Sequence, residues 1–207
     1  VNGFPQQSVE NAVKYADYAL GEFLQQAKNS DYWRDTLFLV VADHDNRVYG
    51  DALVPVDKFH IPGLILGADI KPKRLSAIAS QIDLAPTLLS LAGISTYVPT
   101  LGQDLSAGTA PANRAFLQFN QTFAYLEGSS QPAQITLLRP DAEPLVGSYN
   151  LSQRQFGELQ PAPAQKAKEA LAWANLPSWL YREQRYFVPL AADATTNRRK
   201  EVASSAE

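Results

Sequence analysis

One short run of apolar residues constrains this chain more than any other feature. It spans residues 36–42, with the letters TLFLVVA, and it is followed directly by Asp43 and His44. Such a run of apolar and β-branched residues predicts a strand buried on both faces, as in a parallel sheet. In open α/β sheets, ligands bind in the crevice outside the carboxyl ends of the strands. We therefore expect Asp43 and His44 to be a pair of metal ligands at that edge.

The same pair also has a purely structural interpretation. An Asp after a strand commonly forms a turn or caps a helix, and a neighbouring His then only hydrogen-bonds the loop. The second of the two histidines, His60, directly precedes the apolar run 61–66. If the two runs are neighbouring parallel strands, we expect His60 along the same rim as Asp43 and His44. A metal held there still needs two or more further ligands.

The composition indicates a globular protein and excludes several classes of function. Of the 207 residues 45% are hydrophobic, and the net charge is −3. Without a basic stripe, nucleic acid is excluded as a partner. No apolar run approaches the roughly 18 residues that cross a bilayer and no apolar leader opens the chain, so we expect this part to be soluble. The absence of cysteine excludes disulfides and thiol catalysis. The absence of methionine indicates a fragment, or a sequence from which residues are missing.

Hydrophobic periodicity predicts the elements before residue 110. A helix is expected over 8–28, with Ser8 as its N-cap, followed by strands over 36–42 and 61–66. A second helix is expected over 80–93, with Pro86 in its first turn and Gly93 at the left-handed position beyond its end.

From about residue 113 the pattern changes to short alternating runs. These predict a meander of four antiparallel strands, over 115–119, 123–126, 134–138 and 144–149. A linker over 160–164 and a helix over 165–187 follow, and residues 192–207 have the composition of a disordered tail.

Five segments, taken in order, resemble one family of enzymes. They are YADYALG (15–21), LVVADH (39–44), HIP (60–62), QIDLAPTLLSLAG (81–93) and LGQDL (101–105). Together they resemble the carboxyl-terminal half of sulfatase-like enzymes in the alkaline phosphatase superfamily. Within that group, lipoteichoic acid synthases and phosphoglycerol transferases of bacterial membranes are the most similar. The resemblance covers about residues 8–110, and the small antiparallel sheet and last helix are also similar to that group.

The resemblance implies a fold in three parts. Residues 1–110 are expected to be the carboxyl-terminal half of a sulfatase-like α/β domain, with a parallel sheet flanked by helices. Residues 111–190 are expected to form a small four-stranded antiparallel subdomain with a carboxyl-terminal helix, and residues 191–207 a disordered tail.

The resemblance also implies a divalent metal, Mn²⁺ before Mg²⁺ or Zn²⁺, held by an Asp-His pair, a Glu and a nucleophilic Thr. Asp43 and His44 match the pair. The Glu and the nucleophile are expected in an amino-terminal half, so no catalytic residue is assigned here. In such enzymes the Thr attacks a phosphate or sulfate ester, and the metal acts as a Lewis acid. The nearest hydroxyls, Ser80, Thr87 and Ser90, belong to a helix whose pattern indicates packing.

Two further residues are candidates for substrate binding. His60 matches a His-Val-Pro segment of phosphoethanolamine transferases, and a structural histidine is the alternative. Arg47 has the guanidinium fork that matches phosphate oxygens, and a solvated loop arginine is the alternative. Asp45 follows the Asp-His pair where many relatives have glycine.

The resemblance thus implies a fragment of a metal-dependent phosphotransferase or hydrolase for phosphoglycerol-type esters, inactive as an isolated chain. Its partners are expected to be a phosphate or sulfate ester, including a phospholipid headgroup, and the missing amino-terminal half. The full protein is expected in the bacterial inner membrane, with this part periplasmic or extracellular. The alternatives are a sulfatase, and a non-catalytic α/β interaction domain in which Asp43 and His44 only stabilise a loop.

Overall fold

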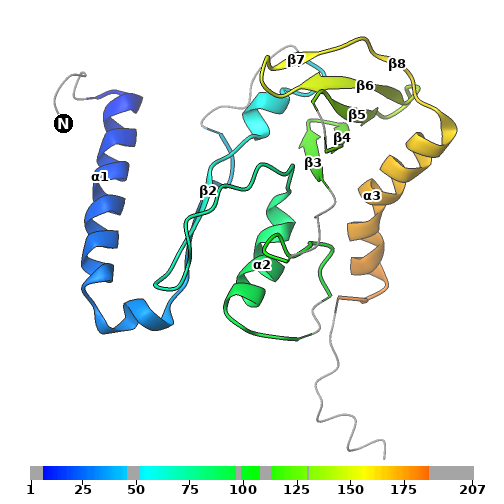
Figure 1. The fold of residues 1–207 in the computed structure, drawn as a ribbon. Helices are drawn as coiled ribbons and strands as arrows, with labels where there is room; N and C mark the ends of the chain where they lie inside the picture. Colours follow the sequence, from blue (N-terminus) through cyan, green and yellow to red (C-terminus); the bar gives the residue numbers. More distant parts are fainter. Residues whose placement is uncertain (1–6, 46–51, 97–98, 108–112, 130, 187–207) are drawn as a thin grey trace, which may run out of the picture. The chain divides into compact units, whose positions relative to one another are not determined.

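The computed structural model describes residues 7–45, 52–96, 99–107, 113–129 and 131–186 (Figure 1). The chain divides into two compact units. Unit 1 consists of Val1–Asp43 and Ile61–Arg74, and unit 2 of His44–His60 and Leu75–Glu207. The tail predicted to be disordered, 192–207, lies outside the described residues.

Helix α1 (Val9–Lys28) of unit 1 confirms the first predicted helix. The side chain of Ser8 caps it, because its Oγ accepts a hydrogen bond of 3.2 Å from the N–H of Asn11. This bond satisfies one of the backbone donors that every helix start leaves without an intrahelical partner. The helix ends at Asn29, and the short 3₁₀ helix η1 (Asp31–Asp35) follows.

Strands β1 (Phe38–Val41) and β2 (Gly63–Leu66) form the two-stranded sheet of unit 1. They pair antiparallel, which differs from the predicted parallel arrangement. A parallel pair needs a connection that crosses over the sheet. Here the connection instead buries Val54 in the core of unit 2, and its described part holds only the 3₁₀ helix η2 (Val56–Phe59). None of the eight strand residues is buried, although the sequence predicts burial on both faces.

The antiparallel register determines which ends of β1 and β2 lie together. Val41 lies opposite Gly63, and the N–H of Ala42 donates to the carbonyl of Pro62 over 3.3 Å. The chain therefore leaves β1 and enters β2 at the same end of the sheet. In a parallel pair these two points would lie at opposite ends of the sheet. The expectation that His60 shares a rim with Asp43 is therefore incompatible with the predicted parallel pair and requires an antiparallel one.

In unit 2, η3 (Gln81–Asp83) and α2 (Leu84–Leu91) form the second predicted helix. Pro86 lies in the first turn of α2, where the missing N–H has no helical partner to lose. Gly93 has a φ of +70° just beyond the helix end, the left-handed conformation that favours glycine. Both residues stand where the sequence predicts them.

The predicted antiparallel meander is confirmed, and two short strands extend it. Strands β3 to β6 pair in sequence order, and both β7 and β8 pair with β6. The strands are β3 (Arg114–Phe119), β4 (Thr122–Glu127), β5 (Ala133–Leu138), β6 (Leu145–Asn150), β7 (Gln155–Phe156) and β8 (Gln160–Pro161). Strand β8 thus occupies the start of the segment 160–164 that the sequence predicts as a linker.

Both faces of this sheet are covered. Helix α3 (Ala164–Arg182) packs against β4 and β5 (Figure 1). The ring of its Trp173 lies 4.9 Å from that of Phe116. Successive side chains of a strand point to opposite faces. On the face opposite Phe116, Ile135 is fully buried in a cluster that includes Val54. The hydrophobic core therefore lies in unit 2.

Candidate functional site

Asp43 and His44 follow β1 after one intervening residue, Ala42. Both side chains are exposed, and the backbone bends at both residues. Asp43 is the last residue of the first segment of unit 1, and His44 is the first residue of unit 2. The pair therefore stands at the point where the chain passes from one unit to the other, rather than in a packed interior.

The imidazole of His44 contacts the backbone of the next residue. Its Nδ1 lies 2.7 Å from the carbonyl oxygen of Asp45. A carbonyl can only accept, so Nδ1 donates in this contact. A backbone carbonyl that binds one ring nitrogen is a common way to orient a metal-binding histidine. The side chain of Asp45 forms an ion pair of 3.4 Å with Lys58, which links the two ends of the segment 44–60.

The second histidine lies at the end of the same segment. His60 is exposed and ends η2, where its N–H donates to the carbonyl of Asp57 over 3.4 Å. The other candidate for substrate binding, Arg47, lies outside the described residues. Within the part of the chain that the structure describes, no group of three or more His, Asp or Glu side chains could hold a metal ion. Asp43 and His44 therefore do not make a complete metal shell.

A buried polar cluster around Asp83 is the functional or structural feature that the sequence analysis missed. Asp83 is fully buried. Its Oδ2 accepts a hydrogen bond of 2.8 Å from the N–H of Ser80. Its Oδ1 accepts from the N–H of Gln103 over 2.9 Å and from Nη2 of Arg114 over 3.3 Å. A buried carboxylate is costly unless it is paired and hydrogen-bonded, and here one cation and two amides compensate it.

Thr87 and Gly102 extend this cluster. The hydroxyl of Thr87 donates to the carbonyl of Asp83 over 2.6 Å and accepts from the N–H of Leu105 over 2.9 Å. A Cβ at Gly102 would lie 1.9 Å from the carbonyl oxygen of Ile82, so only glycine fits there. The cluster therefore holds the LGQDL segment against the start of α2, with the Thr87 hydroxyl hydrogen-bonded to both.

A second charged cluster joins α3 to β4. The ammonium of Lys166 pairs with Glu127 and, over 3.4 Å, with Glu169, which also lies 3.3 Å from the hydroxyl of Tyr125. Burial, followed by the charges of both glutamates, raises the pKa of Tyr125 above its ordinary value. The hydrogen bond to Glu127 raises the pKa of Lys166, although burial opposes it. These groups connect a helix to a sheet.

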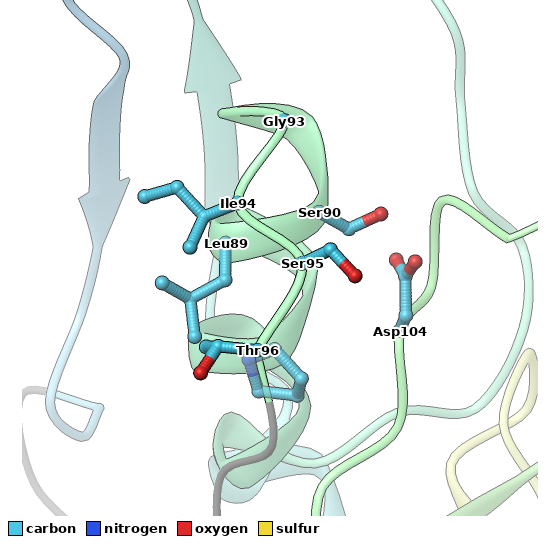
Figure 2. A pocket seen from close by; sticks show the side chains of 8 residues that line it. Leu89, Ser90, Gly93, Ile94, Ser95, Thr96 and Asp104 are labelled. Atoms are coloured by element: carbon cyan, nitrogen blue, oxygen red, sulfur yellow. The ribbon is translucent and has the colours of Figure 1, made fainter. Parts of the chain in front are cut away.

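A hollow of about 390 Å³ lies beside the carboxyl end of α2 (Figure 2). The side chains of Ser90 and Ser95 point toward Asp104 across it. Burial raises the pKa of Asp104, but hydrogen bonds from Ser106 and Ser90 outweigh it and leave the pKa lowered. The described lining residues include no basic side chain, so the hollow does not suit an anionic phosphate or sulfate ester. Its lining consists of Pro86, Leu89, Ser90, Gly93, Ile94, Ser95, Thr96 and Asp104.

Comparison with known proteins covers the segment that contains Asp43 and His44. Residues 7–94 match the sulfatase family model, a range that contains Asp43, His44, His60 and the α2 segment. A solved structure of a protein in the alkaline phosphatase superfamily from Vibrio parahaemolyticus matches 91% of this chain with a TM-score of 0.78 and 37% sequence identity. The predicted resemblance is confirmed. The α/β class predicted with it is confirmed as well.

Curated relatives match over shorter stretches. Phosphoglycerol transferase I of Xanthomonas campestris pv. campestris is 31% identical over 105 residues, which cover 49% of this chain and 15% of that protein. Arylsulfatase K of Gallus gallus is 30% identical over 95 residues, 43% of this chain and 18% of that protein. A lipoteichoic acid synthase-like protein of Bacillus subtilis is 26% identical over 121 residues, 46% of this chain and 18% of that protein.

The chain spans only a part of all these proteins. It covers less than a fifth of the curated relatives and 46% of the Vibrio chain. The sulfatase-like segment can therefore be compared residue by residue, whereas the remainder of the relatives has no counterpart in this sequence.

Proposed function

We propose that this chain is the part of a sulfatase-type enzyme that supplies Asp43 and His44 to a divalent metal ion. One observation carries the proposal: an exposed Asp-His pair lies just beyond the end of β1, within the segment that matches the sulfatase family. The whole enzyme acts on phosphoglycerol-type phosphate esters. The isolated chain is inactive, because the nucleophile and the remaining metal ligands come from the part of the protein that it does not contain.

The donor set fits a hard or borderline divalent cation. A carboxylate oxygen and an imidazole nitrogen suit Mn²⁺, Mg²⁺ or Zn²⁺, with Mn²⁺ our choice. The contact of His44 with the carbonyl of Asp45 orients the ring, which supports His44 as a ligand of the ion in this proposal. When bound, the ion polarises the ester and lowers the pKa of the attacking hydroxyl.

The rest of the segment between β1 and β2 serves the substrate in this proposal. His60, at its far end, contacts the ester or supports the ligands, and Arg47 binds its anionic oxygens through the guanidinium fork. The ion pair between Asp45 and Lys58 links the ends of the segment on which these groups stand. At 41% and 40% side-chain exposure this pair contributes little free energy of folding.

We take phosphate esters as the first candidate substrates, because phosphoglycerol transferase I is among the matched relatives. Phosphoglycerol transferase I of Xanthomonas campestris covers 49% of this chain, whereas arylsulfatase K covers 43%. The difference is small, and a sulfuric ester hydrolase is therefore the second candidate, supported by the family model itself. By analogy with the phosphoglycerol transferases and the lipoteichoic acid synthase-like protein, we place the parent in the bacterial inner membrane, with this part outside the cytoplasm. No helix among the described residues is long and apolar enough to cross a bilayer.

The test is ester cleavage by the longer parent protein with Mn²⁺. Asp43→Asn and His44→Ala are each expected to abolish cleavage of glycerophosphate esters, whereas the exposed control Asp69→Asn retains it. Parallel assays with p-nitrophenyl phosphate and p-nitrophenyl sulfate separate the two candidate substrates. Full activity in either site variant would exclude the metal assignment, and it would favour a non-catalytic role for the pair.

A second test uses the 207-residue chain alone. Two protein ligands do not complete a metal shell, so calorimetric titration with Mn²⁺ is expected to give a dissociation constant weaker than about 1 μM. The same chain is expected to show no turnover of either p-nitrophenyl ester. Submicromolar affinity, or turnover that His44→Ala removes, would mean that the missing ligands or the nucleophile lie within this chain.

A further inference from the structure

Helix α3 carries large apolar side chains on its outer side as well as on the side that packs against the sheet. On the inner side, the ring of Trp173 lies 4.9 Å from that of Phe116 in β3. On the outer side, Leu171 is 51% exposed, Trp179 is 42% exposed and Tyr181 is 72% exposed. The solvent side of a surface helix is ordinarily polar, and exposed apolar groups that gather in one place mark interaction sites. The outer side of α3 is therefore a candidate interaction surface.

The exposed charges on this side of the molecule are mostly positive. Within the helix, Lys168 and Arg182 are exposed, and the single acid of the helix, Glu169, is half-buried against β4. Just beyond the helix end, Glu183 and Arg185 are both exposed. The exposed charged residues from 168 to 186 are thus three cations and one acid, whereas the whole chain has a net charge of −3. The outer side of α3 is therefore a local positive region on an acidic chain.

The turn that ends α3 holds the aromatic and cationic groups together. The N–H groups of Gln184 and Arg185 donate to carbonyls of the last helical turn, over 3.2 and 2.9 Å respectively. Gln184 has a φ of +52°, so the helix ends in a Schellman motif with a residue other than glycine in the left-handed position. The motif places the guanidinium of Arg185 5.5 Å from the ring centre of Trp179. It also stacks the rings of Tyr181 and Tyr186, whose centres lie 5.9 Å apart.

We propose that the outer surface of α3 lies on the surface of a bilayer that contains anionic phospholipids. Tryptophan and tyrosine are enriched at the interface between membrane and water, because their rings have an apolar body and a polar tip. Lysine and arginine attract anionic headgroups, while their aliphatic stems lie along apolar surface. A helix that presents both kinds of side chain to one side is typical of binding in the plane of the interface. The surface comprises Lys168, Leu171, Trp179, Tyr181, Arg182 and Arg185.

The inference rests on the proposed function in one respect, which is the membrane location of the parent enzyme. It requires no metal, no ester cleavage and no role for Asp43 or His44. Lipid is favoured as the occupant because the charge of the surface is complementary to anionic headgroups. The other occupants of such a surface are a second copy of this chain, another protein, or solvent alone, and the experiment separates lipid from these.

The experiment is cosedimentation of the 207-residue chain with two kinds of vesicle, phosphatidylcholine alone and phosphatidylcholine mixed with phosphatidylglycerol. Binding to the mixed vesicles is expected to be at least about fivefold stronger, and to weaken as the salt concentration rises. Arg182→Gln is expected to weaken binding to the mixed vesicles about fivefold, because one cation near the headgroups is lost. Tyr181→Ala is expected to weaken binding to both kinds of vesicle at least about threefold, because apolar contact is lost.

The matched controls lie in unit 1. Arg74→Gln removes the same charge from an exposed position, and Tyr15→Ala removes a ring that is 67% exposed, against 72% for Tyr181. Both controls are expected to bind within about twofold of the wild type. Asp43→Asn is also expected to bind as the wild type does, which separates this test from that of the metal site.

Three results would overturn the inference. The first is no binding of the wild-type chain to the mixed vesicles, which would leave the surface to a protein partner or to solvent. The second is an equal loss of binding for Arg182→Gln and for its control. The third is a homodimer, detected by light scattering, in which amide exchange shows α3 to be the protected surface.

Discussion

At the scale of single residues, Asp83 shows how a buried charge is held. Its carboxylate has two backbone N–H donors and the guanidinium of Arg114, and that guanidinium also donates to the carbonyl of Leu101 over 2.9 Å. The cation lies 5.0 Å from the ring centre of Phe116 and 5.3 Å from that of Trp173, within the range of cation–π attraction. One carboxylate thus connects η3, the LGQDL segment, β3 and α3.

Asp83→Asn is expected to destabilise the chain by roughly 3 kcal/mol or more, because it leaves the buried charge of Arg114 without its counter-charge. The amide also turns one acceptor into a donor that faces an N–H group. The measurement is urea unfolding followed by tryptophan fluorescence. The exposed control Glu143→Gln is expected to change the free energy of unfolding by less than about 0.5 kcal/mol. A similar small change for Asp83→Asn would show that the cluster is not a stabilising contact.

Only part of this cluster could be predicted from the sequence. Ser80 and Asp83 have the spacing of a capping box, and that capping box is present. The partner Arg114 lies 31 residues further on, and no periodicity indicates which distant cation will meet a buried acid. The same limit applies to Asp43 and His44, whose position after a strand was predictable but whose remaining ligands were not.

At the scale of elements, the local sequence pattern predicted where each helix and strand lies better than it predicted how the strands pair. Ser8, Pro86 and Gly93 mark helix ends in the sequence, and α1 and α2 begin and end there. The apolar runs predicted β1 and β2, but an apolar run is the same in parallel and antiparallel pairs. The relative direction of the two strands depends on where the connection between them packs. Val54 of this connection is buried in the core of unit 2.

The contact between α3 and β4 is expected to weaken at alkaline pH. The pKa values of Tyr125 and Lys166 are both raised in the folded chain. A group with a raised folded pKa stabilises fully below its unfolded pKa, about 10 for tyrosine, and this stability is lost as the pH rises toward the folded value. Tyr125→Phe removes one such group, so its free energy of unfolding is expected to fall less steeply above pH 10. Unfolding in urea between pH 8 and 11 measures this, and parallel curves would contradict it.

At the glycine within α1, a substitution is expected to stabilise the helix rather than to destabilise it. A Cβ at Gly21 would meet no atom within 4 Å, so Gly21→Ala is expected to stabilise the helix by about 0.5–1 kcal/mol. Gly102→Ala, whose Cβ would overlap the carbonyl of Ile82, is expected to lower the melting temperature instead. Circular dichroism during thermal unfolding compares the two variants. A loss of helix stability in Gly21→Ala would mean that this face of α1 is packed.

At the scale of the whole molecule, the two units differ in how much they bury. The cluster of buried core residues lies entirely in unit 2, where both faces of the six-stranded sheet are covered. Among the described residues of unit 1, only Ala27 is a buried hydrophobic residue. Composition predicted a core of sufficient size, but it gave no indication of this unequal distribution, because burial depends on which strands acquire a second layer.

Unit 1 is therefore expected to open more readily than unit 2. Local stability follows buried apolar contact, and regions with little of it exchange their amide hydrogens through low-energy openings. In the isolated chain, amides of β1 and β2 are expected to exchange faster than those of β4 and β5, and to lose protection at a lower urea concentration. Hydrogen exchange read by mass spectrometry in increasing urea measures both. Ile135→Ala, which removes a fully buried side chain of β5, is expected to accelerate exchange in β4 and β5 and to leave the exchange of β1 and β2 unchanged. If all four strands instead lost protection together, the chain would unfold as one cooperative body, and unit 1 would not be a separate region of low stability.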